Sequence, residues 1–227
     1  DSTANGPDLG DRDYFGRSIA NMGDRDDWDG EDGIVLAVGA TRDNAGQGER
    51  GAVHIVFVNT NGSVDSTVEI DDSTANGPVL ANDDKFGRSS ANIGDMDGDG
   101  VDDLAVGAVN DDVLHIMFMN ANGTPKSTIE IDESTARGPD LSNGDGFGRS
   151  SANIGDLDRD GIDDLAVGAN GDDVLHIMFM EGVTTPSQVG TVTPTCGNAQ
   201  SALSWSAPAT RGAAITDYII QYSTDNS

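Results

Sequence analysis

Two short acidic loops carry the residues that are best suited to bind a metal ion. The sequence GDMDGDGVDDLAVGA runs from Gly94 to Ala108, and GDLDRDGIDDLAVGA repeats its pattern from Gly155 to Ala169. Acidic residues occupy loop positions 1, 3, 5, 8 and 9, and glycine occupies position 6. Carboxylates that alternate in a glycine-bent loop converge on one point, and such hard oxygen ligands favour Ca²⁺. Both loops are therefore predicted calcium sites.

The residues after each loop distinguish it from an EF-hand. An EF-hand needs a bidentate Glu at position 12 and a helix on each side. Position 12 is Val106 or Val167 here, inside an apolar LAVGA run that is typical of a strand. The sequence thus predicts a strand–loop–strand site whose last carboxylate is at position 9. A solvated acidic turn is the alternative, but acids this dense repel one another unless a cation lies among them.

A looser copy of the loop lies nearer the N-terminus, between Gly23 and Ala40. It has three extra residues, and Val35 stands where the other loops have the position-9 Asp. Trp28, in the insertion, is expected to be exposed together with Asp29 and to be available for contacts. The acids of this loop are further candidate metal ligands: Asp24, Asp26, Asp29, Glu31 and Asp32.

Charge excludes several classes of partner. The 227 residues include 40 acidic and 12 basic side chains, which gives a net charge of −28. Neutralising phosphates requires Lys and Arg, so no nucleic acid is expected to bind, and an anionic membrane surface is disfavoured for the same reason. No apolar run has the length of a transmembrane helix. Cys196 is the single cysteine, so metal rather than an internal disulfide would stabilise an extracellular form.

Internal repeats predict the architecture. Phe-Gly-Arg-Ser begins at Phe15, Phe86 and Phe147, at intervals of 71 and 61 residues. A complete unit contains four strand-like pieces, such as KFGRSSAN, DLAVGA, HIMFM and STIEI, with turn residues between the third and fourth. No segment shows a clear helical period. A four-stranded meander that recurs about every 60 residues is the pattern of β-propeller blades.

These units resemble the FG-GAP repeat of integrin α subunits and their bacterial relatives. The resemblance rests on Phe-Gly, the Asp-x-Asp-x-Asp-Gly-x-x-Asp loop and Val-Gly-Ala, and it extends from Asp1 to about Glu181. In that family calcium lies in the loops between the first two strands of a blade. The resemblance implies four aspartates and one backbone carbonyl as ligands in each loop: Asp95, Asp97, Asp99, Asp103 and the carbonyl of Val101, and then Asp156, Asp158, Asp160, Asp164 and the carbonyl of Ile162.

The repeats predict an all-β fold with two four-stranded blades and one three-stranded blade. They are expected to fill residues 1–182, in units of about 1–71, 72–132 and 133–182. The third unit has no equivalent of the fourth strand. Three blades cannot close a ring of the usual four to eight, and an unpaired strand edge favours pairing with another chain. The chain is expected either to be a fragment of a longer protein or to be completed by neighbouring chains.

Residues 183–227 are expected to form a separate, incomplete β-sandwich. Their composition shifts to Thr, Ser, Pro and Ala, and VGTVTPT, SALSWSAP and ITDYIIQYS have the alternation of three strands. With Trp205, Tyr218 and Tyr222 in place, the segment resembles the opening of a fibronectin type III module. That sandwich has about seven strands, so most of the module is missing here.

Side chains that recur once per unit are expected to be structural. The histidines should bond backbone or a neighbouring Asp, and the arginines should pair with loop acids. They are His54, His115 and His176, and Arg17, Arg88 and Arg149. No nucleophile elbow and no glycine-rich loop before a helix is present, so no enzymatic site is predicted.

The sequence therefore predicts an extracellular or cell-surface calcium-binding protein with a structural or adhesion role. Its repeats should be stabilised by Ca²⁺ and should assemble with other copies through open strand edges, as a filament or a multi-chain propeller. One alternative is a propeller module that binds surface glycans or proteins. Another is the non-catalytic part of a larger secreted enzyme.

Overall fold

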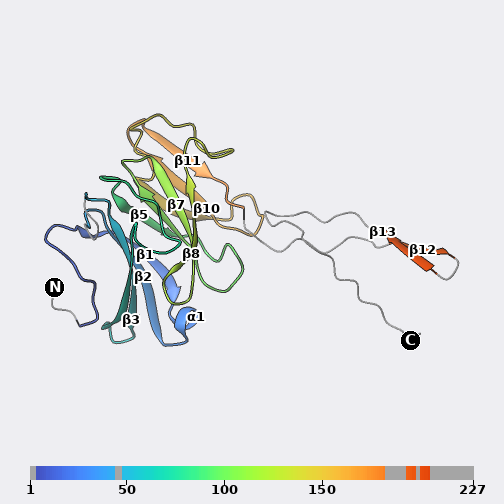
Figure 1. The fold of residues 1–227 in the computed structure, drawn as a ribbon, viewed down its shortest axis with the longest axis horizontal. Coiled ribbons are helices and arrows are strands. Elements are labelled where there is room, and N and C mark those ends of the chain that lie inside the picture. The colour runs from blue at the N-terminus through green and yellow to red at the C-terminus, as the bar shows by residue number, and fades with distance from the viewer. Residues whose placement is uncertain (1–3, 44–47, 182–192, 198–199, 205–227) are drawn as a thin grey trace. The chain divides into compact units, whose positions relative to one another are not determined.

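The computed structural model describes residues 4–43, 48–181, 193–197 and 200–204. The chain divides into two compact units, Asp1–Met180 and Glu181–Ser227. The described part of the first unit is built from three antiparallel sheets (Figure 1). No helix among the described residues is long and apolar enough to cross a membrane.

Each sheet of the first unit is a meander in which neighbouring strands follow one another in the chain. The first sheet contains β1 (Phe15–Asp24), β2 (Gly33–Ala40), β3 (Ala52–Asn59) and β4 (Val64–Ile70). The second contains β5 (Phe86–Asn92), β6 (Leu104–Ala108), β7 (Val113–Met119) and β8 (Pro125–Ile131). The third contains β9 (Ser150–Gly155), β10 (Asp164–Ala169) and β11 (Val174–Met178). The predicted all-β fold of two four-stranded sheets and one three-stranded sheet is confirmed.

The two central strands of the middle sheet are buried on both faces, which explains their unbroken apolar runs. Every residue of β6 and β7 is buried. Successive side chains of a strand point to opposite faces. Met117 and Met119 accordingly pack into the core shared with the first sheet, whereas Leu114, Ile116 and Phe118 pack into the core shared with the third. The cores thus lie between sheets, and each sheet depends on its neighbours for burial.

The same side-chain hydrogen bonds join each first strand to the next. A serine hydroxyl donates to the Phe-Gly carbonyl of the following sheet, from Ser18 to Gly87 at 3.0 Å and from Ser89 to Gly148 at 2.9 Å. An asparagine Nδ2 donates back to the preceding strand, from Asn92 to the Asn21 carbonyl at 3.0 Å and from Asn153 to the Asn92 carbonyl at 3.1 Å. The repeated FGRSxAN sequence is therefore the sequence of an inter-sheet seam.

The glycine of Val-Gly-Ala lies where this seam is tightest. A Cβ built on Gly107 would be 1.8 Å from the carbonyl oxygen of Gly148. Gly39 has the same relation to Gly87, at 2.0 Å. A real Cβ cannot approach backbone oxygen so closely, so only glycine fits between the sheets.

The repeated histidines pack within their own sheets, where His54 and His115 are buried and His176 is half-buried. Each ring meets the Phe of its Phe-Gly pair edge to face, with centroid distances of 5.5, 5.2 and 5.4 Å along the chain. His54 also bonds Asp43, with 3.2 Å between Nε2 and Oδ2. Burial lowers the pKa of His115 to about 4, so this imidazole is neutral at pH 7. The geometry supports the structural role expected for the histidines.

The second unit is described only as one hairpin, β12 (Thr193–Gly197) paired with β13 (Gln200–Ser204). These strands overlap the first two segments expected to be strands, 189–195 and 201–208. The third expected strand lies outside the described residues, as do Trp205, Tyr218 and Tyr222. The likeness to a fibronectin type III module therefore stays a prediction.

Substituting Gly107 with alanine should destabilise the first unit by about 1–3 kcal/mol, because the new methyl group must push the second and third sheets apart. Gly168 is the equivalent glycine of the third sheet. Its Cβ would meet only the Ser150 hydroxyl, at 2.5 Å, and that side chain can rotate. Chemical denaturation of G107A and G168A in dilute solution checks this, and equal losses of stability would contradict the role given to the seam.

Candidate metal centres

The third loop brings three predicted ligands together. Asp156, Asp158 and Asp164 each offer one carboxylate oxygen, and these oxygens lie within 4.8 Å of one another. Backbone amides fix the first of these residues, because Asp156 accepts hydrogen bonds from Asp160 N at 3.1 Å and Gly161 N at 3.0 Å. The loop therefore presents a cluster of hard oxygen atoms of the kind that binds Ca²⁺.

The position-9 aspartate ties this loop to the sheet. Asp164 is fully buried at the start of β10. One of its oxygens accepts from Leu157 N at 2.8 Å, and the other accepts from Met180 N at 3.0 Å. A single carboxylate thus holds the loop and the chain that follows β11. A charge beside the Asp164 carboxylate therefore changes the stability of the third sheet.

The second loop has the same arrangement. Asp95, Asp97 and Asp103 form its triad, again with ligand oxygens within 4.8 Å of one another. Asp103 is fully buried and accepts from Met96 N and Met119 N, each at 2.9 Å. Burial raises the pKa of Asp103 to about 7. A cation in the loop would favour its ionised form.

A lysine lies against this second triad. Lys126, on β8, places Nζ 2.6 Å from Asp97 Oδ2 and also contacts Asp99. The other oxygen of Asp97, Oδ1, is buried and has no hydrogen-bond partner among the described residues. The ammonium group therefore neutralises part of the cluster and leaves one orphaned carboxylate oxygen. That oxygen is the kind of group that a bound cation would satisfy.

The remaining predicted ligands lie in the loops but outside the two triads. Asp99 Oδ1 accepts from Val101 N at 3.0 Å, and Asp160 Oδ1 accepts from Ile162 N at 2.9 Å. Both position-5 aspartates therefore shape the turn just before the expected carbonyl ligands. Of the four carboxylates predicted for each loop, the structure brings three together. The complete ligand sets remain predictions.

The first loop is organised around an arginine. Arg25 is buried, and its guanidinium pairs with Asp29 and Asp65, each at 2.8 Å, and donates to Asn59 Oδ1 at 3.0 Å. The other candidate acids of this loop are exposed: Asp24, Asp26, Glu31 and Asp32. No three of the candidate acids in this described loop lie close enough to share one ion. The geometry does not support a metal here, because Arg25 already supplies the cation.

Trp28 corrects two sequence-based expectations. The three extra residues allow a single helical turn, α1 (Asp26–Asp29), where no helix was predicted. The turn carries Trp28 into the core, where its side chain is 4% exposed and its Nε1 donates to the Met22 carbonyl at 3.1 Å. Its ring also meets Phe57 edge to face at 6.0 Å. Trp28 is therefore a packing residue and not an exposed contact point.

The charge compensation by Arg25 and by Lys126 involves the same position of the repeat. Asp65 on β4 and Lys126 on β8 occupy the same register position, one residue after Val64 and Pro125 respectively. In the first sheet this position is acidic and meets Arg25 of the loop, and in the second it is basic and meets loop acids. Sequence reasoning missed this exchange, although Lys126 is one of only two lysines in the chain.

Among the described residues, the third loop has no such internal cation. No Lys or Arg pairs with Asp156, Asp158 or Asp164 in the described part of the chain. Its acids are also the more exposed of the two triads. The third loop is therefore the best candidate for Ca²⁺, which would supply the missing positive charge. The second loop would hold Ca²⁺ only with Lys126 displaced or shared.

Comparison with known proteins shows similarity to integrin α chains. The chain is 32% identical to human integrin α-6 over 161 residues, which cover 70% of this chain and 13% of the relative. It is 34% identical to Xenopus laevis integrin α-4 over 86 residues, 37% of this chain and 8% of the relative. It is 30% identical to Drosophila melanogaster integrin α-PS5 over 95 residues, 41% of this chain and 10% of the relative.

The chain spans about a tenth of the length of these relatives. No family model matches it. The similarities support an integrin-α-like relationship for the repeats and leave the activity of the chain to be argued from its own residues.

Replacing Asp158 with asparagine should weaken calcium binding at the third loop at least about tenfold, because a charged oxygen ligand is lost from the triad. Asp163→Asn is the matched control. It lies in the same loop, removes the same charge and stands outside the triad, where it accepts from Asn153 Nδ2 at 2.8 Å. Calcium titration calorimetry on both variants checks this, and equal affinities for D158N and D163N would contradict the assignment.

Proposed function

We propose that this chain is an extracellular, calcium-stabilised structural or adhesion module that assembles head to tail with other copies of itself. Its repeats occupy residues 1–182 in this proposal, and residues 183–227 belong to a fibronectin type III-like module. The division of the chain into units at Met180 and Glu181 supports that boundary. The integrin-α-like relationship supports the extracellular location.

The outer face of the third sheet is the observation that carries the assembly proposal. Leu175, Ile177 and Phe179 are 64%, 41% and 57% exposed. Their equivalents in the second sheet, which pack against the third, are 0%, 0% and 8% exposed: Leu114, Ile116 and Phe118. The third sheet therefore presents the apolar surface that the second sheet uses to bind its neighbour.

Polar groups on this face repeat the same pattern. In the second sheet, Asp112 accepts from Gly144 N at 2.6 Å and from Phe147 N at 3.1 Å. Asp173 is the equivalent residue of the third sheet, and it is exposed. The hydroxyl of Ser150, the equivalent of Ser89, makes no hydrogen bond within the described residues, although its backbone pairs with β10. The face thus offers the acceptors and donors that the next Phe-Gly strand would use.

The first sheet supplies a complementary surface. Phe15 is 39% exposed, whereas Phe86 and Phe147, which follow another sheet, are fully buried. Asn21 stands where Asn92 and Asn153 donate to a preceding strand. The first sheet of one copy therefore matches the third sheet of another at Phe-Gly and at this asparagine. This face, in addition to the open strand edges, would direct assembly.

Two other functions have less support. A glycan-binding propeller would use exposed aromatic side chains at equivalent places in each repeat. Trp28 is buried, and the exposed Tyr14 is replaced by Lys85 and Gly146 in the other two repeats. The non-catalytic part of a secreted enzyme remains a second candidate, because the repeats could serve there as a stable support. Calcium-dependent head-to-tail assembly would favour the proposed role over a role as part of a secreted enzyme.

Replacing Leu175 with aspartate should abolish self-association, because a charge would be buried in the proposed interface. Val79→Asp is the control, since Val79 is 83% exposed in the connector before β5 and lies on neither docking sheet. Sedimentation velocity of the wild type, L175D and V79D in millimolar calcium measures the effect. We expect multimers for the wild type and V79D, and monomers for L175D.

Two results would contradict head-to-tail assembly. One is a wild-type chain that stays monomeric at high protein concentration in calcium. The other is loss of association in V79D to the same extent as in L175D, which would mean that added charge alone is responsible. If calcium still stabilises a monomeric wild type, the metal role stands and only the assembly is wrong.

A further inference from the structure

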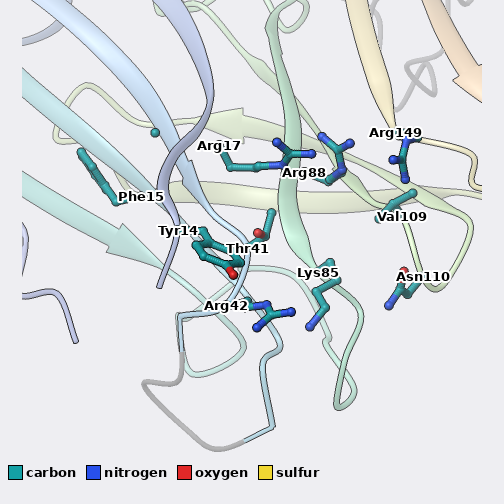
Figure 2. Close-up of a pocket in the computed structure, with 11 residues that line it drawn as sticks. Tyr14, Phe15, Arg17, Thr41, Arg42, Lys85, Arg88, Val109, Asn110 and Arg149 are labelled. Carbon is teal, nitrogen blue, oxygen red and sulfur yellow. The ribbon is translucent and has the colours of Figure 1, made fainter. Parts of the chain in front are cut away.

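A pocket of about 520 Å³ gathers positive charge in this strongly acidic protein (Figure 2). We call it the basic pocket and define it by its five cationic side chains. They are Arg17, Arg42, Lys85, Arg88 and Arg149. These are five of the 12 Lys and Arg residues in a chain with 40 acids. None of the described residues that line the pocket is Asp or Glu.

Two of the five cations, on one side of the pocket, are already balanced. Lys85 Nζ lies 2.6 Å from Asp83 Oδ1 and also contacts Glu49. Arg42 Nε lies 3.5 Å from Glu49, and its guanidinium stacks over the Tyr14 ring at 4.8 Å. These contacts hold both side chains in place. Because both are paired with acids, Lys85 and Arg42 add little net charge to the pocket.

The other three cations have no such partner. Arg17, Arg88 and Arg149 make no ion pair and no side-chain hydrogen bond within the described part of the chain. The expectation that they pair with loop acids is therefore wrong for these residues. Burial lowers the pKa of Arg88, and the charges of Arg17 and Arg149 lower it further. Each of the three repels the others in the folded state.

The seam between the sheets brings these three arginines together. Each arginine follows a Phe-Gly pair, in β1, in β5 and immediately before β9. The serine and asparagine hydrogen bonds hold the first strands side by side, so the arginines lie in a row across three sheets (Figure 2). Asn110 and Tyr14 add polar groups to the same lining. The backbone of the seam thus sets where the three arginines start; Arg88 is half-buried, and Arg17 and Arg149 are exposed beside it.

We propose that the basic pocket binds a compact oxyanion with at least two negative charges, such as a sulfate group or a dicarboxylate. A guanidinium presents a planar fork of N–H donors that pairs with carboxylate, sulfate or phosphate oxygens through two parallel hydrogen bonds. Three unpaired forks in one pocket match the several oxygens of such a group. An anion there would also remove the repulsion among the arginines.

The charge of the whole chain selects for a small ligand. At a net charge of −28, the surface repels a long polyanion such as nucleic acid or a heavily sulfated polymer. Screening confines this repulsion to about a Debye length, roughly 8 Å at physiological ionic strength. A single dianionic group can enter the pocket and contact the arginines directly. The ligand is therefore a free small anion or one such group at the end of a larger molecule.

The test titrates the full chain with sodium sulfate or sodium succinate in calcium buffer, against sodium chloride at equal ionic strength. We expect sulfate or succinate to bind by calorimetry and to raise the melting temperature, with no such effect of chloride. Tighter binding of sulfate would identify a tetrahedral group as the ligand, and tighter binding of succinate would identify a dicarboxylate. If neither exceeds chloride, the proposal is wrong.

Variants separate the pocket from general charge effects. Arg88→Met should weaken binding about tenfold or more, because a charge-assisted hydrogen-bonding fork is lost. Arg88→Lys keeps the charge but loses the fork, so its affinity should lie between those of the wild type and R88M. Arg137→Met is the control. It removes the same charge, and Arg137 is exposed in the connector before β9. Equal binding by R88M and R137M would overturn the proposal.

Stability of the anion-free protein gives an independent readout. Removing Arg88 relieves repulsion from Arg17 and Arg149, so R88M should melt no lower than the wild type without sulfate. A lower melting temperature for R88M would assign Arg88 a structural role and contradict the site. If R88M does not fold, Arg17→Met makes the binding test at an exposed position.

Discussion

Repulsion among carboxylates in the loops between first and second strands is the constraint on which the repeat region depends. Each loop collects acids beside a tight turn, and the second and third loops bury their position-9 aspartate completely. A buried carboxylate needs hydrogen bonds and a nearby positive charge. Backbone amides supply the hydrogen bonds in both loops. The source of the positive charge differs from one sheet to the next.

The acidic loops of the three sheets differ in how their negative charge is compensated. Arg25 neutralises the first loop from within, and Lys126 reaches the second from a neighbouring strand. In the described residues the third loop has neither, so it is the loop that most requires a metal. The loops therefore predict a gradient in calcium dependence along the chain, although the second and third loops have nearly the same sequence. The arginines of the basic pocket pose the opposite problem, excess positive charge, at the seam of the same sheets.

Much of this structure could be predicted from the sequence, because the repeat encodes it locally. Phe-Gly, the acidic loop and Val-Gly-Ala place the first two strands of each sheet, and the apolar run after each histidine places the third. The seam was not predictable, since the Gly107 contact with Gly148 joins residues far apart in the chain. Lys126 and Arg25 were missed because Lys126 meets Asp97, and Arg25 meets Asp65, across distant parts of the chain. Trp28 was misjudged because a three-residue insertion gave no sign of the helical turn that buries it.

Hydrogen exchange with and without calcium tests the central claim most directly. Amide protection would be measured by mass spectrometry for β2, β6 and β10, in millimolar calcium and again after chelation. The account predicts that protection falls most in β10, which starts at Asp164, and least in β2, whose loop holds Arg25. A ligand at 100 times its Kd contributes about 2.7 kcal/mol, so roughly a hundredfold faster exchange in β10 is expected. Equal exchange in β10 with and without calcium would contradict the account.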